Sequence, residues 1–113
     1  MHEYSIVQAM FTRIEEAARG QGAIAVRHVK VRIGQLAGVD VGLLQTAYEM
    51  YRADTICDGA TLGVTVVPAR WCCPEGHGDL VAGQRLTCTQ CGRAARLAAG
   101  DEIILEQLEL EVP

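Results

Sequence analysis

The chain has 113 residues, a length that suits one compact domain or one domain carrying a small insert. Its formal net charge of −4 is the wrong sign for a general nucleic-acid binder, and no apolar run approaches the ~20 residues of a membrane span. The first residues show no basic segment followed by an apolar stretch. We therefore expect no secretory signal and a cytoplasmic protein without nucleic-acid or membrane partners.

Apolar residues between positions 5 and 18 recur every three or four residues and predict a helix with one apolar face. That face is expected to hold Ile6, Met10, Ile14 and Ala17. Residues 26 to 33 alternate between apolar and polar side chains, which predicts a half-buried strand with His28 on its solvated face. The loop after this strand leads to Asp40, which is placed to cap a second helix.

A second alternating run extends from Leu62 to Val66 and should end at Pro68, because proline cannot continue a central strand. A third strand is expected after Glu102, with the acidic Glu106 as an exception on its apolar face. The other residues of that face are Ile104, Leu108, Leu110 and Val112. This order predicts an α+β fold, in which two helices cover a small sheet of about three strands.

Between residues 70 and 100, cysteine, glycine and proline replace regular periodicity. We expect this segment to form an inserted, zinc-ribbon-like module, and residues 1–69 and 101–113 to form the α+β domain. Five cysteines in a chain without a signal peptide indicate metal ligands more than disulfides. Cys57 stands apart from the other four and is interpreted as a small buried residue.

The segment Cys88-Thr89-Gln90-Cys91-Gly92 is the strongest metal signal. A C-x-x-C turn holds two thiolates close together, and the glycine lets the backbone fold beneath the metal. Upstream, Cys73 and His77 can complete a tetrahedral Zn(II) site, with Cys72 as the alternative to either. Such a closed site is structural and leaves no position for a substrate, which favours a protein that is not an enzyme.

Two other interpretations of the cysteines compete with structural zinc. Cys88 and Cys91 could form a redox dithiol, which predicts titratable thiols and no bound metal. Alternatively, the irregular upstream half could leave a weak site that a partner completes. Zinc is the leading interpretation, because metal binding can organise a short insert that has little apolar surface of its own.

The start Met1-His2-Glu3 offers a second metal site. A free α-amine, the His2 amide nitrogen and the His2 ring nitrogen can close two adjacent chelate rings on one ion. The Glu3 amide or its carboxylate could supply a fourth ligand. Amide and imidazole nitrogens favour Ni(II) or Cu(II) over zinc. The competing interpretation is that His2 is simply a solvated residue near a frayed terminus.

Taken together, these residues resemble the HypA/HybF family of hydrogenase maturation factors over nearly the whole chain. The resemblance rests on Met1-His2-Glu3, Ser5-Ile6, Val31-Arg32-Ile33-Gly34-Gln35-Leu36, Asp58-Gly59-Ala60-Thr61-Leu62, Cys88-Thr89-Gln90-Cys91-Gly92 and Gly100-Asp101-Glu102-Ile103. It implies a nickel metallochaperone that helps to insert Ni(II) into the large subunit of nickel-iron hydrogenase, together with the GTPase HypB. Some relatives also serve urease.

The resemblance places the transient nickel ligand on His2 with Glu3 beside it, so that the α+β domain binds nickel. It places zinc ligands on Cys73, Cys88 and Cys91, whereas the fourth family cysteine would fall at Gly76 and is missing. We expect His77 to replace it. Asp40 is expected to be a helix cap, with a nickel-site role as the alternative.

The runner-up function is a zinc-ribbon module that binds protein or nucleic acid and has no nickel role. It is supported by the local positive charge of the insert, which carries Arg70, Arg85, Arg93 and Arg96. Salt-dependent binding to DNA or RNA would distinguish it from nickel delivery.

Overall fold

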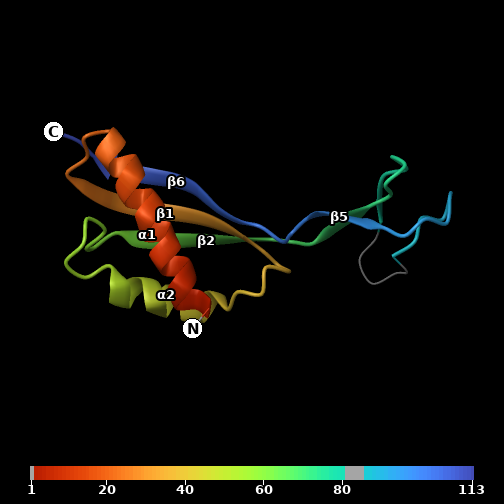
Figure 1. The fold of residues 1–113 in the computed structure, drawn as a ribbon, viewed down its shortest axis with the longest axis horizontal. Helices are drawn as coiled ribbons and strands as arrows, with labels where there is room; N and C mark the ends of the chain where they lie inside the picture. Colours follow the sequence, from red (N-terminus) through yellow and green to blue (C-terminus); the bar gives the residue numbers. More distant parts are fainter. Residues whose placement is uncertain (1, 81–85) are drawn as a thin grey trace.

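A computed structural model describes residues 2–80 and 86–113 and shows two three-stranded sheets arranged end to end (Figure 1). The larger sheet has the order β2-β1-β6, formed by β1 (Ala25–Gly34), β2 (Thr61–Val67) and β6 (Ile103–Glu111). The smaller sheet has the order β4-β3-β5, formed by β3 (Arg70–Cys72), β4 (Asp79–Leu80) and β5 (Arg96–Ala99). The molecule is elongated, with extents of 57 × 28 × 17 Å.

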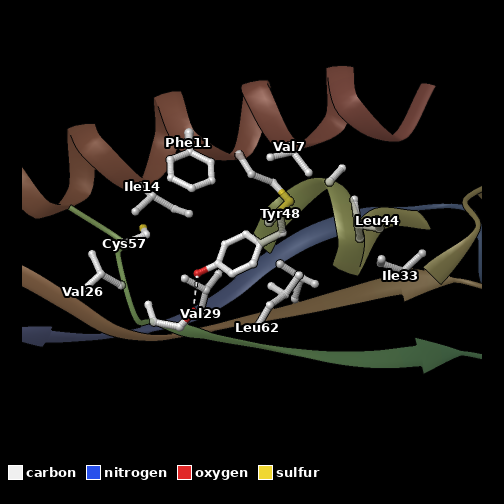
Figure 2. Close-up of a cluster of buried hydrophobic side chains, with 14 residues drawn as sticks. Val7, Phe11, Ile14, Val26, Val29, Ile33, Leu44, Tyr48, Cys57 and Leu62 are labelled. Atoms are coloured by element: carbon white, nitrogen blue, oxygen red, sulfur yellow. Dashed lines mark hydrogen bonds between the residues drawn. The ribbon is translucent and has the colours of Figure 1, made fainter. Parts of the chain in front are cut away.

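Two helices, α1 (His2–Gly20) and α2 (Val41–Tyr51), pack with the larger sheet around one hydrophobic core. Figure 2 shows the core in the layer between the helices and the sheet, with Phe11 and Tyr48 above Val29. The predicted α+β architecture is therefore confirmed, while the division at residues 70 and 100 stays a prediction. None of the described helices has the length and apolarity to cross a membrane.

The predicted first helix is present but begins at His2, earlier than expected. Met10 and Ile14 of the expected face are buried and Ile6 packs against the core, but Ala17 is exposed and Ala18 takes its place. Val7, Phe11, Ile14 and Ala18 form one buried row, with Met10 buried beside it. Their spacing of four, three and four residues follows the helical period of 3.6.

The expected face of the third strand is partly wrong. Leu108 and Leu110 pack against the core as predicted, but Ile104 is 40% exposed and Leu105 takes the core position. The cause is a β-bulge: Lys30 pairs with Gln107 whereas Val31 pairs with Leu105, so Glu106 is an extra residue. Because side chains alternate along a strand, one extra residue reverses the orientation of every position before it.

The two sheets meet at the loop after β1, which contacts both segments that connect the larger sheet to the smaller one. The backbone N–H groups of Gly34, Gln35 and Leu36 donate to Glu102, Val67 and Gly100, at N–O distances of 2.8, 2.8 and 2.6 Å. A Cβ added to Gly34 would lie 2.2 Å from the Gly100 carbonyl atoms. This junction therefore requires glycine, and it fixes the points where the chain leaves the larger sheet and returns to it.

Candidate metal centres

The smaller sheet carries a cluster of four potential metal ligands at its outer end. One donor atom from each of Cys73, His77, Cys88 and Cys91 lies within 4.8 Å of all the others. The His77 Nδ1 atom is 3.5 Å from Cys73 Sγ and 3.4 Å from Cys88 Sγ. The Sγ atoms of Cys73 and Cys91 are 3.5 Å apart. The structure thus brings together the four residues that were the leading zinc candidates.

The three separations of 3.4–3.5 Å are close to the edges of a zinc tetrahedron. Ligand bonds of about 2.3 Å to sulfur and about 2.0 Å to nitrogen place the donors of one ion about 3.5–3.8 Å apart. Three thiols and one imidazole are also the donor types that zinc prefers in structural sites. Geometry and donor chemistry therefore both fit a resident Zn(II) ion.

The cluster is built from two turns with matching backbone hydrogen bonds. The Cys73 N–H donates to the Gly78 carbonyl at 3.0 Å, and the Cys88 N–H donates to the Arg93 carbonyl at 2.9 Å. Each of these cysteines also accepts, at its Sγ atom, an N–H bond of 3.4 Å from the residue two positions later. The two turns differ in the position of their second donor. In the first turn His77 follows Cys73 by four residues, whereas in the second turn Cys91 follows Cys88 by three.

The longer imidazole side chain allows this difference, because it reaches the cluster from one position farther along the chain. Gly76, which stands where the resemblance expects a cysteine, has a φ of 86° and donates its N–H to the Cys73 carbonyl at 3.1 Å. A left-handed φ suits glycine and strains other residues. Gly76 therefore closes the turn, and the next residue, His77, places its imidazole in the cluster.

Backbone amides make Cys88 the more acidic thiol of its turn. Hydrogen bonds from the Gln90 N–H, and then from the Cys91 N–H, lower the pKa of Cys88 to about 6. The Arg93 N–H acts in the same direction on Cys91, but burial and the neighbouring Cys73 and Cys88 thiols raise the pKa of Cys91 overall. The turn therefore supplies one ready thiolate, and a cation in the cluster would favour ionisation of the second.

The other two cysteines lie outside the cluster. Cys72 is part of β3, where its neighbours across the small sheet are Asp79 and Arg96. Cys57 is fully buried in the main core, and burial raises the pKa of its thiol to about 11. The interpretation of Cys57 as a small buried residue is confirmed, and Cys73 rather than Cys72 contributes to the cluster.

The second candidate site lies at the start of α1, where His2 is exposed and Glu3 is only 9% exposed. Met1, the expected source of the α-amine, lies outside the described residues. The Asp40 side chain accepts a hydrogen bond of 3.0 Å from the Leu43 N–H, which confirms its predicted role as the cap of α2. The Asp40 backbone N–H donates to Glu3 Oε2 at 3.1 Å, so the two helix starts are joined.

The Glu3 carboxylate is stabilised in its charged form. The hydrogen bond from the Asp40 N–H, then that from its own backbone N–H, and the nearby charge of His2 keep the pKa of Glu3 below its usual value. Sequence reasoning missed this link, because its partners are 37 residues apart and no local pattern marks it. Within the described part of the chain, the cysteine–histidine group is the only one with three or more closely placed potential ligands.

Comparison with known proteins gives consistent matches along the chain. The family model described as "Hydrogenase/urease nickel incorporation, metallochaperone, hypA" matches residues 1–110. Two proteins named hydrogenase maturation factor HypA are similar to this chain over nearly their whole length. That of Nitrosospira multiformis is 40% identical over 112 residues, covering 97% of each chain. That of Shewanella oneidensis is 37% identical over 113 residues, covering 98% of this chain and 96% of the relative.

Solved structures show the same architecture. The solution structure of the Ni metallochaperone HypA from Helicobacter pylori superposes with a TM-score of 0.76 at 25% identity, covering 98% of both chains. A second structure, titled as the solution structure of HypA protein, gives a TM-score of 0.81 at 26% identity. It covers 100% of this chain and 98% of its own.

Proposed function

Because the chain belongs to the HypA family of nickel-incorporation metallochaperones, we propose that it binds Ni(II) as cargo and helps to insert it into nickel-iron hydrogenase during maturation. The observation that carries the proposal is the exposed His2 at the first turn of α1, beside the Glu3–Asp40 contact. An exposed ligand at position 2 suits a chaperone, which must surrender its metal as well as bind it.

The position of His2 and Glu3 within the helix supports ligation by their amide nitrogens. The first four N–H groups of a helix have no partner inside the helix, so these two amides can be given up without breaking the helix. We assign the nickel ligands to the α-amine of Met1, the amide and ring of His2, and the Glu3 amide. Asp40 is the candidate for an additional oxygen ligand.

We propose that Cys73, His77, Cys88 and Cys91 hold a resident zinc ion, which supplies structural cross-linking of the two turns. Glu75 and Arg93, on opposite turns, are joined by an ion pair of 3.2 Å, but these exposed side chains add little by themselves. With four protein ligands the zinc has no open position, which agrees with a protein that is not an enzyme. The proposed partners are a HypB-type GTPase and the hydrogenase large subunit, in the cytoplasm.

The alternative of a nucleic-acid-binding ribbon is less well supported. Two of the arginines that motivated it face carboxylates, since Arg70 lies 3.7 Å from Asp79 and Arg93 lies 3.2 Å from Glu75. Their charge is therefore partly offset within the module. Nickel delivery also gives Met1-His2-Glu3 a role as metal ligands, whereas a zinc ribbon would give these residues no role.

Nickel titration of three proteins tests the proposal: the native chain, His2→Ala, and a chain with an uncleaved N-terminal extension. We expect tight binding to the native chain alone. The substitution removes the ring ligand, and the extension turns the α-amine into an amide that cannot close the first chelate ring. Affinity should also fall on acidification, because amine and imidazole must both lose a proton to bind.

Zinc content is the internal control, because the zinc candidates belong to turns of the smaller sheet, which lies away from α1 (Figure 1). It should be unchanged in all three proteins. If the extended chain binds nickel as tightly as the native one, the α-amine is not a ligand. If His2→Ala also binds normally, the N-terminal site does not exist and the proposed function loses its chemical basis.

A further inference from the structure

We propose that the Glu3 carboxylate is a positioning group that holds Asp40 beside the N-terminal nickel ligands, and that it is not a nickel ligand itself. This inference rests on the proposed function and extends it. It separates two roles that a sequence cannot distinguish, since Glu3 can offer nickel either its amide nitrogen or its carboxylate.

The burial and the contacts of the Glu3 side chain support a positioning role. His2 and Tyr4, its neighbours in the helix, are exposed, whereas Glu3 is only 9% exposed and turns towards the loop before α2. Its Oε2 atom accepts the Asp40 N–H at 3.1 Å. Its carboxylate also accepts its own backbone N–H. Ligation of nickel by this carboxylate would have to pull it away from the Asp40 N–H, a bond that ligation by the Glu3 amide nitrogen leaves in place.

The contact places Asp40 in a position to help the nickel ligands. One Asp40 oxygen is used as the cap of α2, through the 3.0 Å bond from the Leu43 N–H. Asp40 is exposed, and its carboxylate has a second oxygen that can turn to a metal. Because Glu3 is bonded to the Asp40 backbone, the loop cannot move away from His2 without breaking that bond.

Helix electrostatics give a second reason for the arrangement. α1 begins at His2 and α2 begins at Val41, and the two starts lie close together (Figure 1). Each helix start carries a partial positive charge, which disfavours a bound cation. The Asp40 carboxylate, which the bond to Glu3 holds at this place, offsets this charge where the cargo has to bind. Both acids thus act on the nickel site, one by ligation and one by placement.

Two substitutions of Glu3 distinguish positioning from ligation. In Glu3→Gln the side-chain oxygen can still accept the Asp40 N–H, but an amide oxygen is a much poorer nickel ligand than a carboxylate. In Glu3→Ala the acceptor is lost. We expect Glu3→Gln to bind nickel within about twofold of the native chain, and Glu3→Ala to bind about tenfold more weakly, at the lower end of the effect of removing a group that orients a ligand. Equal losses in both variants would overturn the proposal.

A double-mutant cycle with Asp40→Asn tests whether Glu3 acts through Asp40. Asparagine caps a helix as well as aspartate does, so this variant keeps α2 but weakens the candidate ligand. We expect Glu3→Ala to cost no further nickel affinity once Asp40 is Asn, because interacting residues are not additive. Additive losses would show that Glu3 acts independently of Asp40 and would refute the inference.

Circular dichroism and zinc content establish that each variant is folded. If Glu3→Ala does not fold, Glu3→Gln alone decides the question: retained affinity supports positioning, and a large loss indicates a carboxylate ligand. The His2→Ala control keeps the two proposals apart. Nickel binding that depends on His2 but is lost in Glu3→Gln contradicts only the positioning role, whereas binding that does not depend on His2 contradicts the proposed function.

Discussion

Replacement of His77 by alanine tests whether the imidazole is the fourth zinc ligand. Its Nδ1 atom lies within 3.5 Å of the thiols of Cys73 and Cys88, which belong to different turns. Removal of the ring should leave three thiolates, with water as the only replacement. The matched control is Cys72→Ser, since Cys72 lies next to the cluster in sequence but outside it in space.

The expected loss can be estimated from the number of ligands. Structural zinc contributes about 10–16 kcal/mol of binding free energy in small modules, or about 2.5–4 kcal/mol for each of four equivalent ligands. At about 1.4 kcal/mol per factor of ten, His77→Ala should weaken zinc binding by about 100- to 1000-fold. Cys73→Ser should cause a loss at least as large, because a hydroxyl is a poorer ligand than a thiolate.

Competition with a chromophoric zinc chelator, at one pH, gives the affinities of the native chain and the variants. The native chain and Cys72→Ser should retain zinc at chelator concentrations that strip His77→Ala. Two results refute the assignment: unchanged affinity in His77→Ala, or a larger loss in Cys72→Ser than in Cys73→Ser. The second result would transfer the ligand role to Cys72 and require a different path for the first turn.

Two further predictions concern the framework. Gly34→Ala should lower the free energy of unfolding by about 2–4 kcal/mol in denaturant titrations, because the new Cβ would meet the Gly100 backbone at 2.2 Å. The control Gly20→Ala has open space around its new Cβ and should cause no loss of stability. Cys57 should resist alkylation at pH 7 in the folded protein and react only on unfolding, because it is fully buried and its pKa is raised to about 11. Labelling of Cys57 as fast as that of Cys72 would contradict the structure.

Much of the fold could be read from local patterns. The strand at residues 26 to 33, the strand ended by Pro68 and the cap at Asp40 were all predicted, because alternation and capping depend on neighbours in sequence. The bulge at Glu106 could not be derived in the same way, since it appears only in the pairing of β6 with β1. The odd acidic residue on an apolar face was its only trace.

For the candidate sites too, local sequence patterns could be predicted and contacts between distant segments could not. Cys88 and Cys91 are marked by their spacing, and His77 followed from the chemistry of the missing fourth ligand. The contact between Glu3 and Asp40 is set by the way α1 and α2 pack, so no spacing rule could have given it.

The junction at Gly34 also has a consequence for the order of folding. β6 pairs with β1, yet the whole segment between Val67 and Ile103 must first be closed into a loop. Pairing of β3 with β5 brings Arg70 opposite Ala99, which shortens that loop to a few residues. Loop closure costs about 0.6 kcal/mol per doubling of length, so this shortening lowers the entropic barrier to β6 docking by about 2 kcal/mol. The proposed zinc ion, by joining the turn after β3 to the turn before β5, would hold these two strands together and so favour completion of the larger sheet.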